Sequence, residues 1–189
     1  AIDNNSEVDP TPATVTLNAP PQTPAGGQLV TPNTNVPRTV PTGSDSDGTV
    51  DKYRINTLPD ATDGVLYIGN PNLGNVVTAG QLLNPTQLSQ LVFKATPGFD
   101  GGSFTYSAID NTGTADPTPA TFVLATPPTT VDSLGKVNPG DTLQVPGLGG
   151  SDIDGTVASY TINPLPPADQ GTLYLGDPAS GGTAVNPGD

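Results

Sequence analysis

The chain has 189 residues, and its 5 Lys and Arg against 18 Asp and Glu give a formal net charge of −13. So acidic a chain offers no basic patch for nucleic acid, and it has no apolar run long enough to cross a membrane, so we expect neither a nucleic-acid partner nor direct membrane insertion. The absence of Cys and His excludes disulfides, thiol nucleophiles, Ser-His-Asp triads and the usual zinc sites.

Short apolar runs bounded by Gly, Pro, Asn and Asp predict short β-strands. In chain order we expect strands at residues 28–31, 35–42, 49–57, 65–68, 91–95, 103–109 and 120–125, with a further short strand within 76–83. A single helical turn is expected after Asn84, because Asn can cap a helix and Pro85 suits the first helical position. Seven or so short strands at this spacing predict an all-β fold, an antiparallel β-sandwich.

The chain repeats itself at an offset of 107 residues. Over residues 1–71, 34 of the 71 positions are identical to the residue 107 positions later, as in GSDSDGTV at 43–50 and GSDIDGTV at 150–157. The repeat length is about that of one sandwich domain. We therefore expect the C-terminal strand or strands of a preceding repeat at 1–20, a complete repeat at 21–127, and the N-terminal part of the next, incomplete repeat at 128–189.

The boundaries of these copies do not coincide with the boundaries of the chain. The third copy has no counterpart of residues 82–107, and a second copy of the chain could not supply them because its own sequence begins just after that segment. We therefore expect the chain to be a window cut from a longer tandem array. Its repeats are joined by Pro-rich spacers at 19–24 and 126–128, and such spacers are semi-rigid.

Three segments carry a family resemblance: SDSDG followed by VDKYRI, then LVFKATPGFDGGSFTYSAIDNTG, then PATFVLA. They resemble the cadherin-like and Ig-like tandem repeats of very large bacterial surface proteins and adhesins, and the resemblance covers the whole 107-residue unit. It implies a sandwich of about seven strands in each repeat, a beads-on-a-string architecture, and an extracellular location, cell-surface or secreted. It often implies calcium between the beads, although the Asp-Asn-Asp linker of animal cadherins has no clear match here.

Two acidic turns are the candidate metal site. Asp45 and Asp47 precede the expected strand 49–57, and Asp110 follows the expected strand 103–109. In a sandwich of this topology both loops emerge at the end that receives the preceding linker. Carboxylate, amide and backbone carbonyl oxygens are ligands that Ca²⁺ binds. We therefore expect calcium as a cofactor, bound by Asp45, Asp47 and Asp110, and by Asp152 and Asp154 in the third copy. Asp-x-Asp-Gly is also a good turn without any metal, so both interpretations stay open.

The sequence predicts a non-enzymatic structural or adhesion repeat. It would act as a semi-rigid spacer of a long extracellular stalk or filament, stiffened by calcium at the junctions, with neighbouring repeats and other copies in a filament as partners. The alternative is a module that binds cell-surface glycan or a neighbouring chain, for which Tyr67 and Tyr174 are candidate contacts. Phe93, Phe99, Phe104 and Tyr106 are expected in the core rather than on a sugar-binding surface, and Asp100 is expected to shape a turn.

Overall fold

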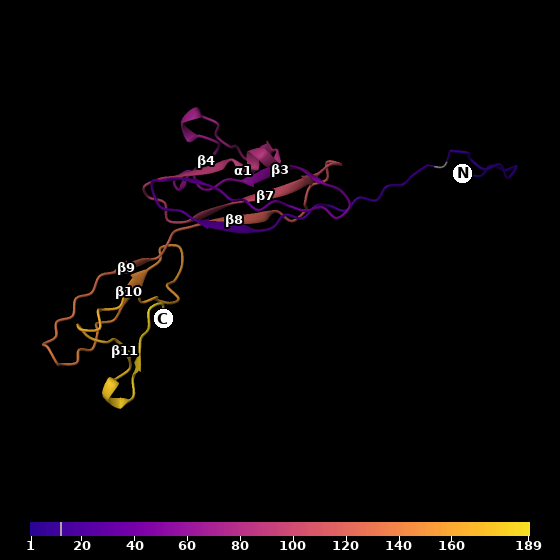
Figure 1. Cartoon of the computed structure of the whole chain (residues 1–189). Helices are drawn as coiled ribbons and strands as arrows, with labels where there is room; N and C mark the ends of the chain where they lie inside the picture. The colour runs from indigo at the N-terminus through magenta and orange to yellow at the C-terminus, as the bar shows by residue number, and fades with distance from the viewer. Residues whose placement is uncertain (12) are drawn as a thin grey trace. The chain divides into compact units, whose positions relative to one another are not determined.

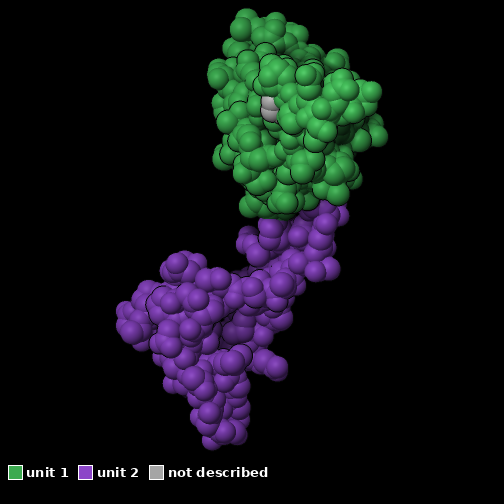
Figure 2. Space-filling view, turned by 90° about the vertical axis from the view of Figure 1, so that its right-hand side faces the viewer, with its two compact units in different colours: residues 1–127 green, residues 128–189 purple. Residues whose placement is uncertain are grey.

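The computed structural model describes residues 1–11 and 13–189 (Figure 1). The chain divides into two compact units, residues 1–127 and residues 128–189 (Figure 2). Strands make up 31% of the chain and helices 6%, so the fold is all-β.

The larger sheet of the first unit has five strands. Its order is β1 (Gly26–Leu29), β8 (Ala120–Ala125), β7 (Gly102–Asp110), β3 (Val50–Thr57) and β5 (Leu82–Leu83). The outer pair β1 and β8 is parallel, and the other neighbours are antiparallel. The strand expected at 120–125 is confirmed with the same bounds.

The smaller sheet has three antiparallel strands in the order β2 (Asn35–Pro37), β6 (Leu91–Ala95) and β4 (Gly64–Ile68). The strand expected at 91–95 is confirmed. The strand expected at 35–42 is too long: β2 ends at Pro37, and of the described residues beyond it only Arg38 still donates its N–H to β6, to Leu91 O at 2.7 Å.

The segment between β4 and β6 differs from the expectation of one short strand within 76–83. Val76 forms only an isolated bridge with Tyr67, and β5 holds just two residues. A 3₁₀ turn, η1 (Pro71–Leu73), precedes them and was not expected. The predicted helical turn is present as α1 (Pro85–Ser89), and Asn84 and Gln87 form a reciprocal capping box at its start.

One hydrophobic core lies between the buried faces of the two sheets. Alternate residues of each strand point inward, so a single cluster collects apolar side chains from β3, β4, β6, β7 and β8. Phe104 and Phe122 stack with ring centroids 5.1 Å apart, and Phe93 meets Phe99 edge-on at 5.5 Å. The expectation that Phe93, Phe99, Phe104 and Tyr106 are core residues is confirmed.

Arg38 is an unusual neighbour of this core. It follows β2 at an inward-facing position, between Val36 and Val40, and only 2% of it is exposed. Its Nε donates to the carbonyl of Val36 at 2.8 Å. Its Nη1 and Nη2 are buried and have no hydrogen-bond partner among the described residues.

The second unit is an open structure with short strands. They are β9 (Thr129–Val131) with β10 (Gly149–Ser151), and β11 (Tyr174–Leu175) with β12 (Thr183–Ala184), beside the 3₁₀ turn η2 (Pro178–Ser180). Within residues 128–189, all of which are described, no residue is fully buried. The unit therefore has local structure without a closed core.

Several local features of the second unit recur from the first at the sequence offset. Asn70 caps η1 and Asp177 caps η2, and each turn ends in a left-handed glycine, Gly74 or Gly181. A one-residue insertion after Gly181 then raises the offset to 108, and the backbone contacts correspond at that offset: Tyr67 bridges Val76 as Tyr174 pairs with Ala184, and Val77 N donates to Leu66 O as Val185 N donates to Leu173 O.

Candidate functional site

A linker segment, residues 18–23, enters the first unit between two loops. One loop, residues 43–49, precedes β3, and the other, residues 111–119, follows β7. Gln22 and Ser44 exchange two backbone hydrogen bonds, of 2.8 Å and 3.0 Å, like a pair of antiparallel strand residues. The linker segment is therefore paired with the sandwich before β1 begins.

Two of the predicted site residues bind this linker segment directly. Asp47 Oδ2 accepts a hydrogen bond from the backbone N–H of Ala19 at 2.9 Å. Asp110 Oδ2 accepts one from the side-chain amide of Asn18 at 2.7 Å. The structure thus brings the two loops together at one end of the sandwich, and successive linker residues lie against their carboxylates.

Asp110 is almost fully buried, with 1% of its surface exposed. Its Oδ1 accepts from the backbone N–H and hydroxyl of Thr112 and from the backbone N–H of Thr114, at 2.8–2.9 Å. Burial raises the pKa of Asp110, but the donors from Asn18, Thr112 and Thr114 outweigh it and lower the pKa to about 2. The carboxylate therefore stays charged while it organises its own turn and the linker.

Asp116 is a third carboxylate of the site, and the sequence reasoning missed it. Its Oδ2 accepts from the backbone N–H of Thr23 at 2.6 Å, while its Oδ1 accepts from the backbone and hydroxyl of Thr118 at 2.8 Å. Burial raises the pKa of Asp116, but these donors lower it overall. The signal that could have identified it is the repeated motif DPTPAT at 9–14 and 116–121, an Asp-led turn beside the linker.

Asp45 occupies a different place from the other predicted residues. Its Oδ2 is buried, and no described residue hydrogen-bonds to it. A Cβ at Gly48 would lie 2.7 Å from this oxygen and would also collide with Asn111 Oδ1. The two oxygens therefore face the same small space, which only glycine at position 48 leaves open.

The donor set fits the calcium expectation only in part. Asp110 Oδ1 accepts three hydrogen bonds and Oδ2 accepts one, so a metal ion at Asp110 would have to share the carboxylate with these donors. Asp45 Oδ2 and Asn111 Oδ1 are the oxygens that Ca²⁺ could use, although Asn111 Oδ1 also accepts from Thr49 N at 3.1 Å. Among the described residues, no group of three or more His, Cys, Asp or Glu is placed to hold a metal ion.

In the second unit, Asp152 and Asp154 stand at the positions that correspond to Asp45 and Asp47. Asp152 Oδ1 is buried without a hydrogen-bond partner in the described chain, as Asp45 Oδ2 is. Burial and the neighbouring Asp154 raise the pKa of Asp152. Thr129 pairs with Ser151 in the same relationship as Gln22 with Ser44.

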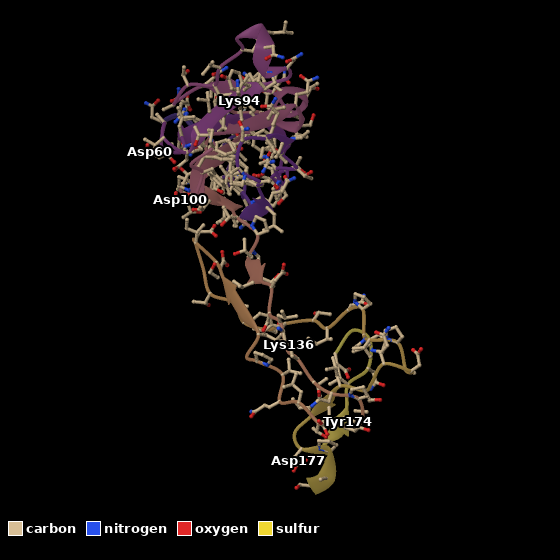
Figure 3. All side chains as sticks on the ribbon, turned by 90° about the vertical axis from the view of Figure 1, so that its left-hand side faces the viewer. Asp60, Lys94, Asp100, Lys136, Tyr174 and Asp177 are labelled. Atoms are coloured by element: carbon tan, nitrogen blue, oxygen red, sulfur yellow. The ribbon has the colours of Figure 1, made fainter. Side chains whose placement is uncertain are left out.

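The remaining candidate residues lie elsewhere. Asp100 is in the turn between β6 and β7, at the same end of the first unit as Asp60 (Figure 3). Burial, then Asp100 and Asp60, raise the pKa of Asp63, which lies near both of them. Tyr67 is half-buried on β4, and Tyr174 is 44% exposed on β11 in the other unit.

Two further findings bear on function. No helix in the described part of the chain has both the length and the apolar character needed to cross a membrane. Comparison with protein families, with curated proteins and with solved structures found no match to this chain.

Proposed function

We propose that this chain is a segment of a tandem array of Ig-like or cadherin-like sandwich repeats, and that it acts as a semi-rigid spacer in a long extracellular protein. The observation that carries the proposal is the linker segment held by Asp47, Asp110 and Asp116. A spacer must keep the direction of the chain from one domain to the next. Hydrogen bonds to charged carboxylates are shorter and stronger than neutral ones, so this contact limits bending at the junction.

The sheet order supports the sandwich assignment. The orders β1-β8-β7-β3-β5 and β2-β6-β4 correspond to the two sheets of an Ig-like domain in which the first strand has joined the sheet of the last. The repeat assignment is supported by the sequence offset of 107 and by the recurring turns and bridges of the second unit. The extracellular location is supported by the family resemblance alone.

In this proposal the linker contacts do not depend on calcium. The contacts of Asp47, Asp110 and Asp116 with the linker need no metal, because each is a direct hydrogen bond from an N–H donor of the linker to a carboxylate oxygen. A calcium ion would be held beside Gly48 by Asp45 Oδ2 and Asn111 Oδ1. It would add rigidity to a junction that is already ordered.

The backbone rigidity of the linker segment is the measurement that tests the spacer function. In the full chain, backbone ¹⁵N order parameters of Asn18, Ala19, Gln22 and Thr23, the linker residues that have an N–H, should be about 0.85, as in a rigid backbone, rather than below about 0.6. Asp47→Ala should remove the hydrogen-exchange protection of the Ala19 amide, because that amide donates to Asp47. Asp51→Ala is the matched control, since Asp51 pairs with the exposed Lys52 and lies outside the linker contact.

Two outcomes would contradict the spacer. Low order parameters at Asn18, Ala19, Gln22 and Thr23 would show a flexible junction. Specific binding of the first unit to a glycan on an array would favour the ligand-binding alternative.

A further inference from the structure

The strand β1 lies at an edge of the five-stranded sheet, with β8 on one side and no strand on the other among the described residues. Val30 N donates to Ala125 O at 2.8 Å, so the even-numbered residues of this segment bond to β8. Successive residues of a strand direct their N–H and C=O groups to opposite sides. The backbone groups of Gly27 and Leu29 therefore point away from β8, towards the open side.

The other edge strands of the first unit are protected against pairing with a further strand. Residues 75–77 cover the outer side of β4, where Ile68 N donates to Asn75 O and Val77 N donates to Leu66 O. β5 has only two residues, and β2 ends in a proline. Short strands, prolines, charged residues and covering segments are the means by which proteins prevent edge-to-edge association. β1 has the sequence GGQL and a regular register, and it contains neither a proline nor a charged residue.

This side of the sheet is also free of charge, in a chain whose net charge is −13. β1, β8 and all of β7 before its last residue, Asp110, contain no charged residue. Residues 10–44 around β1 contain only Arg38, which is buried, and residues 117–131 around β8 contain none. Two such acidic chains repel each other wherever their carboxylates meet. The uncharged side that β1 borders is therefore where a second copy meets the least repulsion.

The exposed residues of β1 and β8 are complementary to a second copy of β1. In an antiparallel pairing centred on Gln28, Gly27 of each copy and Leu29 of the other form a hydrogen-bonded pair through their outward backbone groups. The Leu29 side chain then lies over Gly27, which has no side chain, and next to Val123, the neighbour of Gly27 on β8. Leu29 is 60% and Val123 47% exposed in the single chain, so the pairing removes apolar surface of both from water.

We propose that β1 is an interaction surface for a second copy of this chain, and that two copies join edge to edge through antiparallel β1 strands. The contact is isologous, because the same strand is used by both copies, so it closes at a dimer. Each strand contributes only four residues, so the association of one pair is weak.

The next repeat of the sequence does not share this surface. At the offset of 107, Leu134 and Lys136 stand in place of Gly27 and Leu29. A charged residue such as Lys on an edge strand opposes pairing. Pairing between like repeats would thus fix the register of two neighbouring arrays. This last consequence rests on the proposed tandem array, whereas the dimer itself does not.

Sedimentation of the full chain over a range of concentrations tests the proposal. It should show a monomer–dimer equilibrium at millimolar concentration, and NaCl should strengthen the association because it screens the repulsion between the chains. Leu29→Glu should weaken the dimer roughly tenfold or more, since it places a carboxylate of each copy in the interface. Leu82→Glu is the matched control, because Leu82 is 48% exposed on β5, at the opposite edge of the same sheet, and it should dimerise as the native chain does.

Amide hydrogen exchange locates the contact without any substitution. The N–H groups of Gly27 and Leu29 should gain protection as the concentration of the chain rises. Those of Gln28 and Val30 should be protected at every concentration, because they donate to β8.

Three outcomes would overturn the proposal. They are a chain that stays monomeric at millimolar concentration in high salt, a dimer that Leu29→Glu leaves unchanged, or a dimer in which Gly27 and Leu29 gain no protection. None of these outcomes alters the linker order parameters that test the spacer function, so the two proposals fail separately.

Discussion

Asp47 Oδ2 accepts a 2.9 Å hydrogen bond from the backbone N–H of Ala19, 28 residues earlier in the chain. A backbone donor cannot rotate away as a side chain can, so this contact fixes the path of the linker and not merely the position of one group. Asp116 binds the backbone N–H of Thr23 in the same way. Between these two anchors, the pairing of Gln22 with Ser44 leaves the linker little freedom.

The stability of the first unit should fall at low pH as the carboxylate of Asp110 becomes protonated. Its pKa in the folded chain is about 2, below its ordinary value of 3.8, so it stabilises the fold above pH 3.8 and loses that contribution as the pH falls towards 2. The melting temperature should therefore be nearly constant from pH 7 to 5 and fall between about pH 4 and pH 2. Asp110→Asn should flatten the fall in that window, whereas Asp51→Asn should keep the native profile. An Asp110→Asn chain with the full native acid transition would disprove the assignment.

Replacing Arg38 with methionine should stabilise the first unit. The guanidinium is buried with two nitrogens unpartnered by the described residues, and burial lowers its pKa to about 10. Methionine removes the cost of desolvating that charge, and we expect a gain of about 1–3 kcal/mol in the free energy of unfolding by urea titration. Val145 holds the corresponding position in the second unit, which shows that an apolar residue is accepted at that place in the sequence.

Arg38→Ala provides the comparison for this experiment. It removes the same charge but leaves a cavity beside the core, so it should be less stable than Arg38→Met by about 2 kcal/mol or more. A destabilised Arg38→Met chain would mean that the guanidinium has partners that satisfy it.

Gly64→Ala should destabilise the first unit. Gly64 begins β4 with a φ of 156°, and a Cβ there would collide with the carbonyl of Lys94 and lie 2.6 Å from the ring of Phe93. We expect a loss of about 2–4 kcal/mol in the free energy of unfolding from overpacking and displacement of β6.

Gly171→Ala is the matched control for Gly64→Ala. Gly171 has a similar φ of 144°, but no atom lies within 4 Å of its Cβ position in the described chain. It should leave the unfolding transition of the first unit unchanged. A first-unit transition that Gly64→Ala leaves unchanged would contradict the predicted overpacking against β6.

Calcium should raise the melting temperature of the first unit through Asp45 and Asn111. Ligand at a hundredfold excess over Kd stabilises a native state by about 2.7 kcal/mol, and extracellular modules commonly have Kd values of roughly 10⁻⁴–10⁻³ M, so about 10 mM Ca²⁺ should give a shift of several degrees. Asp45→Asn should abolish the shift, whereas Asp110→Asn should lower the starting stability and retain the shift.

Ionic strength must be matched in that experiment, because a chain of net charge −13 is stabilised by any salt that screens its charges. NaCl at equal ionic strength with a chelator is the reference. Equal melting temperatures in the two solutions would leave Asp45 as a turn residue only.

The sequence could predict those elements whose signals are local. The strands β6 and β8 have uninterrupted inward-facing apolar residues and turn residues on both sides, so their bounds were predicted correctly. The end of β2 was wrong because the strand-like residues after Pro37 leave the sheet, and Arg38 N keeps only one hydrogen bond to Leu91 O. η1, which Asn70 caps and Gly74 ends, was missed because it lies between the strand expected at 65–68 and the short strand expected within 76–83, where only a connection was expected.

The sequence predicted where the candidate site lies, but not which residues its aspartates contact. The position of Asp45, Asp47 and Asp110 in two loops of a sandwich followed from the order of strands. The partners of these aspartates did not, because Asn18 lies 92 residues from Asp110 and no local pattern connects them. Asp116 was overlooked for the same reason, since its partner Thr23 is 93 residues away.

The parallel pairing of β1 with β8 gives the first unit a mechanical property. Four residue pairs, from Gly26 with Phe122 to Leu29 with Ala125, join the first strand of the sandwich to the last. Tension applied through the linker segment and through Pro127 pulls these two strands along their length in opposite directions. The hydrogen bonds between them are then loaded together in shear instead of being opened one after another, so the domain should resist stretching more strongly than its modest core alone would allow.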